Sequence, residues 1–353
     1  MKFNRPTVAD IAAYDEIIDV RSPAEFAEDH IPGAINCPVL DDAQRIEVGT
    51  LYKQVSPFEA KKIGAALVSE NIARHLRTHF LERPKNWKPL IYCWRGGDRS
   101  GSMTTIFRAI GWSAGQLEGG YKAFRRHVIE ALDTLPPQFE FRVLCGSTGS
   151  AKTRILQAIG AAGEQILDLE GLASHKGSVL GVLPEQPQPS QKAFETSLYS
   201  ALSAFDPARP VYVEAESRKI GRMHLPETLI ERIRAGQCIE IKATVEARVD
   251  FLLRDYDYFF TRPDFLIERL DALRSLVSRE TLNGWQDLVR AGEWRQLTGD
   301  LLARHYDPLY ERSQEHNFSG LGTAQVVATD DLSPAGIDTL AREIVQSRIA
   351  QIA

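Results

Sequence analysis

The sequence lacks any long apolar run. A helix that crosses a bilayer needs about 20 predominantly apolar residues, and no stretch of this chain approaches that length. The first residues, MKFNRPTVADIAAYDE, become acidic before the apolar region of a signal peptide could form. We therefore expect a cytoplasmic protein that does not insert into a membrane.

Cysteine is also scarce, and basic residues are not in excess. The 353 residues include four cysteines, at positions 37, 93, 145 and 238, with no CxxC pair and no histidine at zinc-binding spacing. This pattern excludes a disulfide framework and a structural zinc site. The chain has 42 Lys and Arg residues, 47 Asp and Glu residues and a net charge of −5. Binding to nucleic acid must therefore depend on local basic clusters.

Strand-like and helical patterns alternate along most of the chain, which is longer than one hydrophobic core usually serves. Pro136-Pro137 interrupts the first series, and long helical patterns follow residue 244. The sequence predicts an α/β fold with a parallel-sheet domain at residues 1–136, a second α/β domain formed by 137–245 with 320–353, and a mainly helical region at 246–319.

Apolar runs bounded by Gly and Pro predict strands at residues 16–20, 34–39, 89–93, 114–117, 139–145, 165–169, 211–214 and 238–243. Helical spacing predicts helices at residues 23–30, 57–80, 100–110, 121–135, 154–162, 191–204, 226–234, 247–260, 263–279, 281–291 and 333–351.

Cys93 ends one of these strands and is followed by a loop that leads into a helix. Backbone N–H groups at a helix N-terminus favour anions and stabilise a thiolate. We interpret Cys93 as a nucleophile that attacks sulfur or phosphorus, or that carries a transferred chalcogen. The alternative is a buried structural cysteine, which is our interpretation of the other three. The loop adds two arginines, two glycines and a predicted helix cap: Arg95, Arg99, Gly96, Gly97 and Ser100.

A second glycine-containing loop, GSTGSAKT at residues 146–153, joins a predicted strand to a predicted helix. It fits the phosphate-loop pattern G-x4-G-K-[ST], except that Ala151 replaces the second glycine. This predicts a P-loop NTPase-like domain in which Lys152 reaches the phosphates and Thr153 can ligate a magnesium ion. The predicted phosphate-binding residues are Gly146, Ser147, Thr148, Gly149, Ser150, Lys152 and Thr153.

The strand predicted at residues 211–214 leads into a second acidic motif. Glu214 and Glu216 could orient a metal ion or a water molecule, and Arg218 could contact phosphate. Ordinary solvated residues at a strand end are the alternative.

Four segments in order resemble the signature segments of rhodanese domains. They are Asp19–Phe26, His30–Asn36, the loop after Cys93, and Leu117–Tyr121. The spacing from Cys93 to Arg99, C-x5-R, differs from the six-residue loop common in rhodanese sulfurtransferases and is also found in phosphatases of the rhodanese fold. The resemblance implies a rhodanese-like N-terminal domain, and the loop length leaves a phosphatase interpretation open.

A rhodanese-like domain followed by a phosphate loop resembles the tRNA 2-selenouridine synthase family. Further segments that carry this resemblance are Tyr92–Ser102, Gly119–Arg125, Leu169–Ser178, Val213–Gly221 and His305–Ser313. The resemblance implies a transferase that replaces sulfur by selenium in 2-thiouridine at the wobble position of tRNA. In that family the sulfur is first prenylated by geranyl diphosphate, and selenium from selenophosphate then displaces geranylthiol.

The resemblance also implies the ligands and partners of the chain. Our hypothesis is that the phosphate loop binds geranyl diphosphate, with a nucleotide as the alternative ligand, and that the Cys93 loop takes selenophosphate or its selenium. A magnesium ion could bind at Thr153, and we expect no organic prosthetic group. The expected partners are a tRNA and an enzyme that supplies selenophosphate. Candidate contacts to tRNA are the helical region at 246–319, with Trp285 and Trp294, and three basic clusters: Lys122, Arg125, Arg126 and His127; Arg218, Lys219 and Arg222; and Arg232 and Arg234.

Two alternative functions would each account for only half of the chain. A sulfurtransferase or phosphatase could act through Cys93 with the P-loop domain as a regulatory module. A nucleotide-driven RNA-binding switch could instead use the first domain as a scaffold; it would bind RNA in a nucleotide-dependent manner without needing Cys93.

Overall fold

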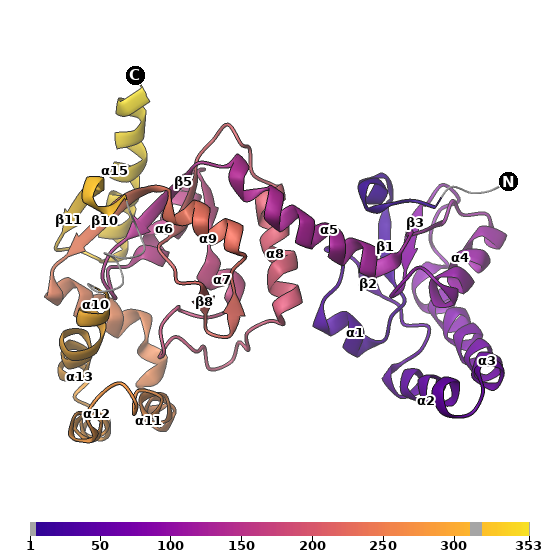
Figure 1. The fold of residues 1–353 in the computed structure, drawn as a ribbon, viewed down its shortest axis with the longest axis horizontal. Helices are drawn as coiled ribbons and strands as arrows, with labels where there is room; N and C mark the ends of the chain where they lie inside the picture. The colour runs from indigo at the N-terminus through magenta and orange to yellow at the C-terminus, as the bar shows by residue number, and fades with distance from the viewer. Residues whose placement is uncertain (1–4, 311–319, 353) are drawn as a thin grey trace. The chain divides into compact units, whose positions relative to one another are not determined.

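The computed structural model describes residues 5–310 and 320–352, and the chain forms two compact units. The first unit contains residues 1–131 together with 189–200, and the second contains 132–188 together with 201–353. Most of helix α8, Gln191–Ser203, therefore belongs to the first unit, although the sequence before residue 189 and after residue 200 belongs to the second. Figure 1 shows the helices and strands in chain order by colour.

The first unit contains a four-stranded sheet in which every neighbouring pair is parallel, in the order β2-β1-β3-β4. Glu16 is aligned with Pro89 and Asp19 with Tyr92, so β1 and β3 end together and place the residues that follow them at one edge. The strands are β1 (Glu16–Asp19), β2 (Ile35–Asn36), β3 (Pro89–Tyr92) and β4 (Gly115–Gln116).

Between residues 5 and 135 the structure has five α-helices. Four correspond to predicted helices, but α2 has no buried side chain and therefore carries no apolar stripe that a pattern search could detect. The predicted helix at 57–80 changes at Leu76 to a π-helical turn that ends at Phe80. The helices are α1 (Pro23–Glu28), α2 (Asp42–Gln54), α3 (Pro57–His75), α4 (Asp98–Ile110) and α5 (Gly120–Thr134).

The second unit contains a five-stranded parallel sheet in the order β11-β10-β5-β7-β6. The two parallel sheets confirm the predicted α/β class. The strands are β5 (Phe141–Cys145), β6 (Gln165–Leu167), β7 (Val211–Glu214), β10 (Gln237–Ala243) and β11 (Gln325–Thr329), and a separate hairpin is formed by β8 (Lys219–Ile220) and β9 (Met223–His224).

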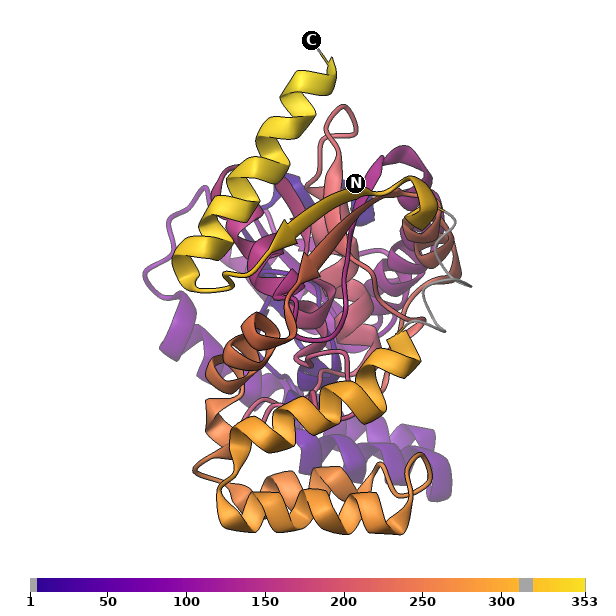
Figure 2. The same cartoon turned by 90° about the vertical axis from the view of Figure 1, so that its left-hand side faces the viewer.

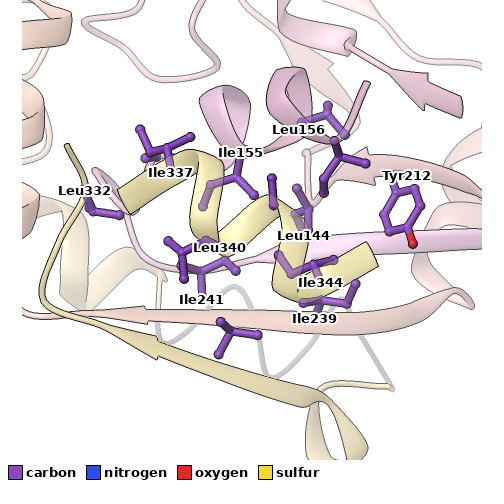
Figure 3. Packing of buried hydrophobic residues seen from close by; sticks show 14 of the residues in the cluster. Leu144, Ile155, Leu156, Tyr212, Ile239, Ile241, Leu332, Ile337, Leu340 and Ile344 are labelled. Carbon is purple, nitrogen blue, oxygen red and sulfur yellow. The ribbon is translucent and has the colours of Figure 1, made fainter. Parts of the chain in front are cut away.

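The last part of the chain completes the core of this second sheet. Helix α15 (Pro334–Ile352) packs against α6 (Lys152–Ala161), and Figure 2 shows it beside β10 and β11. Ile337, Leu340 and Ile344 of α15 meet Leu144 and Ile241 of the sheet (Figure 3). Residues 325–352 are therefore structurally part of the domain that contains the phosphate loop. Helices α7 (Leu169–Ala173) and α9 (Glu227–Arg234) complete this domain.

Side chains between Tyr256 and Tyr306 form a separate apolar cluster that includes Trp285, Leu270 and Leu301. Helices α11 and α12 lie side by side (Figure 2). The predicted helix at 263–279 ends at Asp271, and Ser278 caps the next helix. This region contains α10 (Val245–Asp255), α11 (Pro263–Asp271), α12 (Arg279–Ala291) and α13 (Trp294–Leu301), followed by a π-helical turn at Leu302–Tyr306.

The predicted boundaries of the three regions stay predictions, and residues 311–319 of the helical region, which include the end of the segment His305–Ser313, lie outside the described residues. None of the described helices is long and apolar enough to cross a membrane.

Candidate functional site

Cys93 lies directly after β3, and its side chain is 3% exposed. The hydroxyl of Ser100 donates to Cys93 Sγ over 3.2 Å, and Gln116 Nε2 donates to Ser100 Oγ over 2.9 Å. Helix α4 begins at Asp98 after Gly97, so the predicted helix cap at Ser100 is wrong. Ser100 lies in the first turn instead, where its hydroxyl can hydrogen-bond to a sulfur anion.

The cysteine loop is packed tightly against the segment that ends in Tyr121. Gly96 has a φ of 64°, and a Cβ at this position would lie 2.6 Å from Leu117 O. A Cβ at Gly120 would lie 2.2 Å from Cys93 O, and Tyr121 N donates to the same oxygen over 2.9 Å. Only glycine fits at these two positions, because any side chain would separate the two segments.

A buried network ties the remaining signature segments together. Arg21 pairs with Asp19 over 2.6 Å and donates to Asp29 O over 2.7 Å, and its guanidinium lies 4.0 Å from the ring centre of Tyr121. The hydroxyls of Tyr121 and of Thr196 in α8 both donate to Asp29 Oδ2, over 2.6 and 2.9 Å. Asn36 Nδ2 also donates to Arg21 O over 3.0 Å, so the network joins the segments Asp19–Phe26, His30–Asn36 and Leu117–Tyr121.

The two arginines of the cysteine loop have different environments. Arg99 donates to Glu25 Oε2 over 2.7 Å, and its side chain is 17% exposed. Arg95 is exposed and lines a cavity of about 630 Å³ together with Lys122 and Arg126. The structure thus places Arg95, rather than Arg99, among cations that face solvent.

The phosphate loop connects β5 to α6. Gly146 and Gly149 have φ values of 152° and 83°, and Ala151, at the position where the pattern has glycine, has a φ of 59° in the left-handed region. The loop therefore keeps its backbone course without the second glycine. Ser150 is buried, and its hydroxyl has no hydrogen-bond partner within the described residues.

Lys152 and Thr153 open helix α6 and face two acidic side chains. Lys152 Nζ donates to Gly146 O over 2.7 Å, so the side chain folds back across the loop. Thr153 Oγ1 lies 2.9 Å from Glu170 Oε2 and 2.9 Å from Glu214 Oε2. Carboxylate oxygens of Glu170, Glu214 and Glu216 all lie within 4.8 Å of one another.

Burial and the short distances between the carboxyl groups of Glu170, Glu214 and Glu216 disfavour their charged forms. Burial is the main cause that raises the pKa of Glu170, and burial followed by the neighbouring charges of Glu170 and Glu216 raises the pKa of Glu214 well above its usual value. Burial and the charge of Glu170 raise the pKa of Glu216 to about 8. The carboxyl groups therefore need a proton or a cation to be stable together.

Comparison with known proteins gives the same combination of domains. Residues 7–127 match the profile of the rhodanese-like domain, and residues 139–263 match that of the tRNA 2-selenouridine synthase AAA domain. The tRNA 2-selenouridine synthase of Alcanivorax borkumensis is 36% identical over 329 residues, which cover 84% of this chain and 88% of that protein. The protein of the same name from Marinobacter nauticus is 32% identical over 331 residues, 84% of this chain and 87% of that protein.

This chain belongs to the tRNA 2-selenouridine synthase family. The resemblance inferred from the motifs is thereby confirmed. Among solved structures, the N-terminal domain of a putative ATP/GTP binding protein from Clostridium difficile 630 is 36% identical, with a TM-score of 0.32, over 36% of this chain and 99% of that chain.

The phosphate loop borders a cavity of about 450 Å³. Some of the residues that line this cavity were not predicted as site residues. Glu170 is one of them, and its spacing from the loop gives no short motif. Lys176 is another, and its Nζ lies 2.5 Å from Asp255 Oδ2. Arg248, a buried residue of α10, donates to Thr148 O over 2.8 Å and pairs with Asp307. Arg248 thus supports the loop from outside the cavity, whereas Phe251, Leu252 and Asp255 of the same helix line the cavity itself.

The donor atoms around Thr153 fit a hard divalent cation. Carboxylate and hydroxyl oxygens are the ligands that magnesium prefers in proteins. Glu214 is 1% exposed, and its Oε1 has no hydrogen-bond partner within the described residues. Thr153, Glu170, Glu214 and Glu216 would hold such an ion beside the loop.

Only some side chains of the predicted basic clusters are available to contact tRNA. Arg125 forms an ion pair with Glu195, and His127 Nε2 lies 3.1 Å from Tyr199 Oη, so these two side chains are engaged within the first unit. Arg218 pairs with Glu227 over 2.5 Å and does not border the 450 Å³ cavity. Trp285 is buried in the helical cluster.

Proposed function

We propose that this chain replaces sulfur by selenium in wobble 2-thiouridine of tRNA through an S-geranylated intermediate, with geranyl diphosphate and selenophosphate as substrates. The supporting observation is that the chain has two loops suited to anions, one with the lysine of a phosphate loop and one with a thiol. The pathway has two anionic substrates, so each loop can serve one of them. Family membership supports the nature of the product.

In the first step, the thiocarbonyl sulfur attacks the first carbon of geranyl diphosphate. A sulfur–carbon bond forms, a carbon–oxygen bond breaks, diphosphate leaves and the base releases its N3 proton. The backbone N–H groups of the phosphate loop and Lys152 neutralise charge that develops on the diphosphate. A magnesium ion held beside Thr153 would add positive charge at the same group.

In the second step, selenium from selenophosphate forms a bond to carbon 2 of the base. The carbon–sulfur bond breaks, geranylthiolate leaves and takes a proton, and water cleaves the phosphorus–selenium bond to give phosphate. The loop around Cys93 binds selenophosphate or receives the selenium that selenophosphate delivers. Alkylation in the first step assists the second step, because geranylthiolate is a better leaving group than sulfide. The pathway requires no hydrolysis of ATP.

The proposal is tested by mass spectrometry of tRNA nucleosides from a strain that lacks the gene and from the same strain complemented with this chain. We expect complementation to restore 2-selenouridine derivatives. When selenophosphate supply is also removed, we expect S-geranyl-2-thiouridine derivatives to accumulate. If the complemented strain formed neither nucleoside, the proposal would be wrong, and a change confined to 2-thiouridine would favour the sulfurtransferase alternative.

A further inference from the structure

A second, smaller cavity lies within the second unit, next to the phosphate-loop cavity. It has a volume of about 70 Å³ and is lined mainly by aliphatic and aromatic side chains from helices α10, α11 and α13 and the turns beside them. Those used below are Leu252, Phe260, Trp294, Leu297 and Thr298.

The two cavities adjoin because five residues line both: Thr148, Ser178, Leu252, Tyr256 and Tyr306. Thr148 belongs to the phosphate loop itself. On the phosphate side, Lys152 and Lys176 line the larger cavity, and the ammonium of Lys176 lies 4.1 Å from the ring centre of Tyr256. The lining therefore changes from charged at the loop, where these lysines lie beside carboxyl groups suited to a cation, to apolar among the helices. A ligand that uses both parts needs a phosphate group joined to a short apolar chain.

We propose that the 70 Å³ pocket holds the end of the isoprenoid chain of a prenyl diphosphate whose phosphates lie on the phosphate loop, and that Phe260 and Trp294 limit the length of that chain. This inference rests on the proposed prenyl transfer and adds to it the place of the chain and the residues that select its length.

The size of the pocket supports a length limit. An apolar cavity of about 150 Å³ admits benzene, and this pocket has about half that volume. It therefore admits only the last few carbons of a chain, and the rest of the chain lies in the larger cavity. A fifteen-carbon farnesyl chain needs more space than a ten-carbon geranyl chain, so the small volume favours the shorter one.

Phe260 and Trp294 are suited to form the boundary. Their rings contact each other with centroids 5.0 Å apart, and Phe260 is 37% exposed. Since Phe260 is not enclosed by the core, shortening it extends the pocket toward solvent and leaves the core cluster largely intact. Thr298, one turn after Trp294 in α13, also lines the pocket and is half-buried, so a larger side chain there fills it.

The test uses the full chain and measures transfer of geranyl and farnesyl groups to tRNA that contains 2-thiouridine, together with inhibition by inorganic diphosphate. Phe260→Ala should raise the ratio of farnesyl to geranyl transfer (kcat/KM) at least tenfold. Thr298→Phe should raise KM for geranyl diphosphate at least tenfold, since the carbons displaced from the filled pocket stay exposed to water. Inhibition by inorganic diphosphate should stay unchanged in both, because it has no chain. Leu276→Phe, at an exposed position outside the pocket, is the matched control.

An unchanged prenyl preference in Phe260→Ala, or equal loss of geranyl diphosphate and inorganic diphosphate binding in a folded Thr298→Phe, would overturn the inference. If wild-type protein transfers no prenyl group at all, the proposed function fails, and this outcome differs from a wild-type enzyme whose variants keep the same preference. Because Phe260→Ala is expected to gain an activity, misfolding of Thr298→Phe does not decide the result.

Discussion

Thr153 Oγ1 lies 2.9 Å from Glu214 Oε2, and it lies equally close to an oxygen of Glu170. A hydroxyl has one proton and can donate to only one of these oxygens. The second contact is favourable only when one carboxyl group carries a proton or a cation lies between the oxygens. Burial is the main cause that raises the pKa of Glu170 and of Glu214, and the hydrogen bond from Thr153 acts in the opposite direction.

Magnesium is therefore expected to stabilise the folded protein. An ion that binds only the native state raises its stability by mass action, so adding magnesium chloride to chelator-treated protein should raise the melting temperature. In Glu214→Gln the increase should be lost, because the amide supplies less charge to the ion. Glu227→Gln, at an exposed residue outside the cluster, should behave as wild type. An equal magnesium-dependent increase in Glu214→Gln would contradict the site.

Ala151 is expected to tolerate glycine but not a branched side chain. Its φ of 59° is strained for any residue with a Cβ and most strained for a β-branched one. Ala151→Gly should leave the free energy of unfolding unchanged or raise it by up to about 1 kcal/mol, whereas Ala151→Val should lower it by about 2 kcal/mol or more. Urea unfolding of the two variants measures both changes, and a stable Ala151→Val would show that the loop has another conformation.

The difference between the contiguous loops and Glu170 shows what the sequence could predict. Each loop is a run of adjacent residues between a strand and a helix, so its chemistry can be read without knowing the fold. Glu170, which follows β6, reaches Thr153, which follows β5, because both strands pair with β7 in the sheet. Arg248 reaches Thr148 from a helix 100 positions away. Such contacts depend on tertiary structure and leave no periodic pattern.

The same limit applies to the fold. The strands around Val143 and Val213 were predictable because they are buried on both faces and read as apolar runs. Edge strand β11 was not predicted, since only one of its five residues, Val327, is buried. The association of α8 with the first unit depends on contacts such as Thr196 with Asp29, which no local pattern encodes.

His75 should make the first unit less stable to unfolding in mild acid. Burial lowers the pKa of His75 below 6.5, and its Nε2 lies 2.9 Å from Pro38 O. The folded state then binds fewer protons than the unfolded state, so stability is fully present above about pH 6.5 and is lost as the pH falls toward the lowered pKa. In His75→Gln the loss of stability between about pH 6.5 and 5 should be smaller. Urea unfolding across this range measures it, with the exposed His224→Gln as control; equal losses would contradict the assignment.

The cations that line the 630 Å³ cavity are expected to contact tRNA phosphates. Arg95, Lys122 and Arg126 make no ion pair within the described residues and lie beside the loop of Cys93. Replacing each by alanine should weaken tRNA binding for all sequences and reduce the slope of log affinity against log salt by about 1. Filter binding at several salt concentrations measures this, with exposed Lys61→Ala on α3 as control. Unchanged slopes in all three variants would place the tRNA elsewhere.

The most direct test of the account measures the two half-reactions separately in Lys152→Ala and Cys93→Ser. Geranylation starts from tRNA with 2-thiouridine, and selenation starts from tRNA that is already S-geranylated. Lys152→Ala should lose geranylation about 100-fold or more and keep selenation, while Cys93→Ser should keep geranylation and lose selenation. Lys242→Ala and Cys37→Ser serve as controls at an exposed lysine and a buried cysteine. Loss of selenation with intact geranylation in Lys152→Ala would contradict the assignment of the phosphate loop to the prenyl diphosphate.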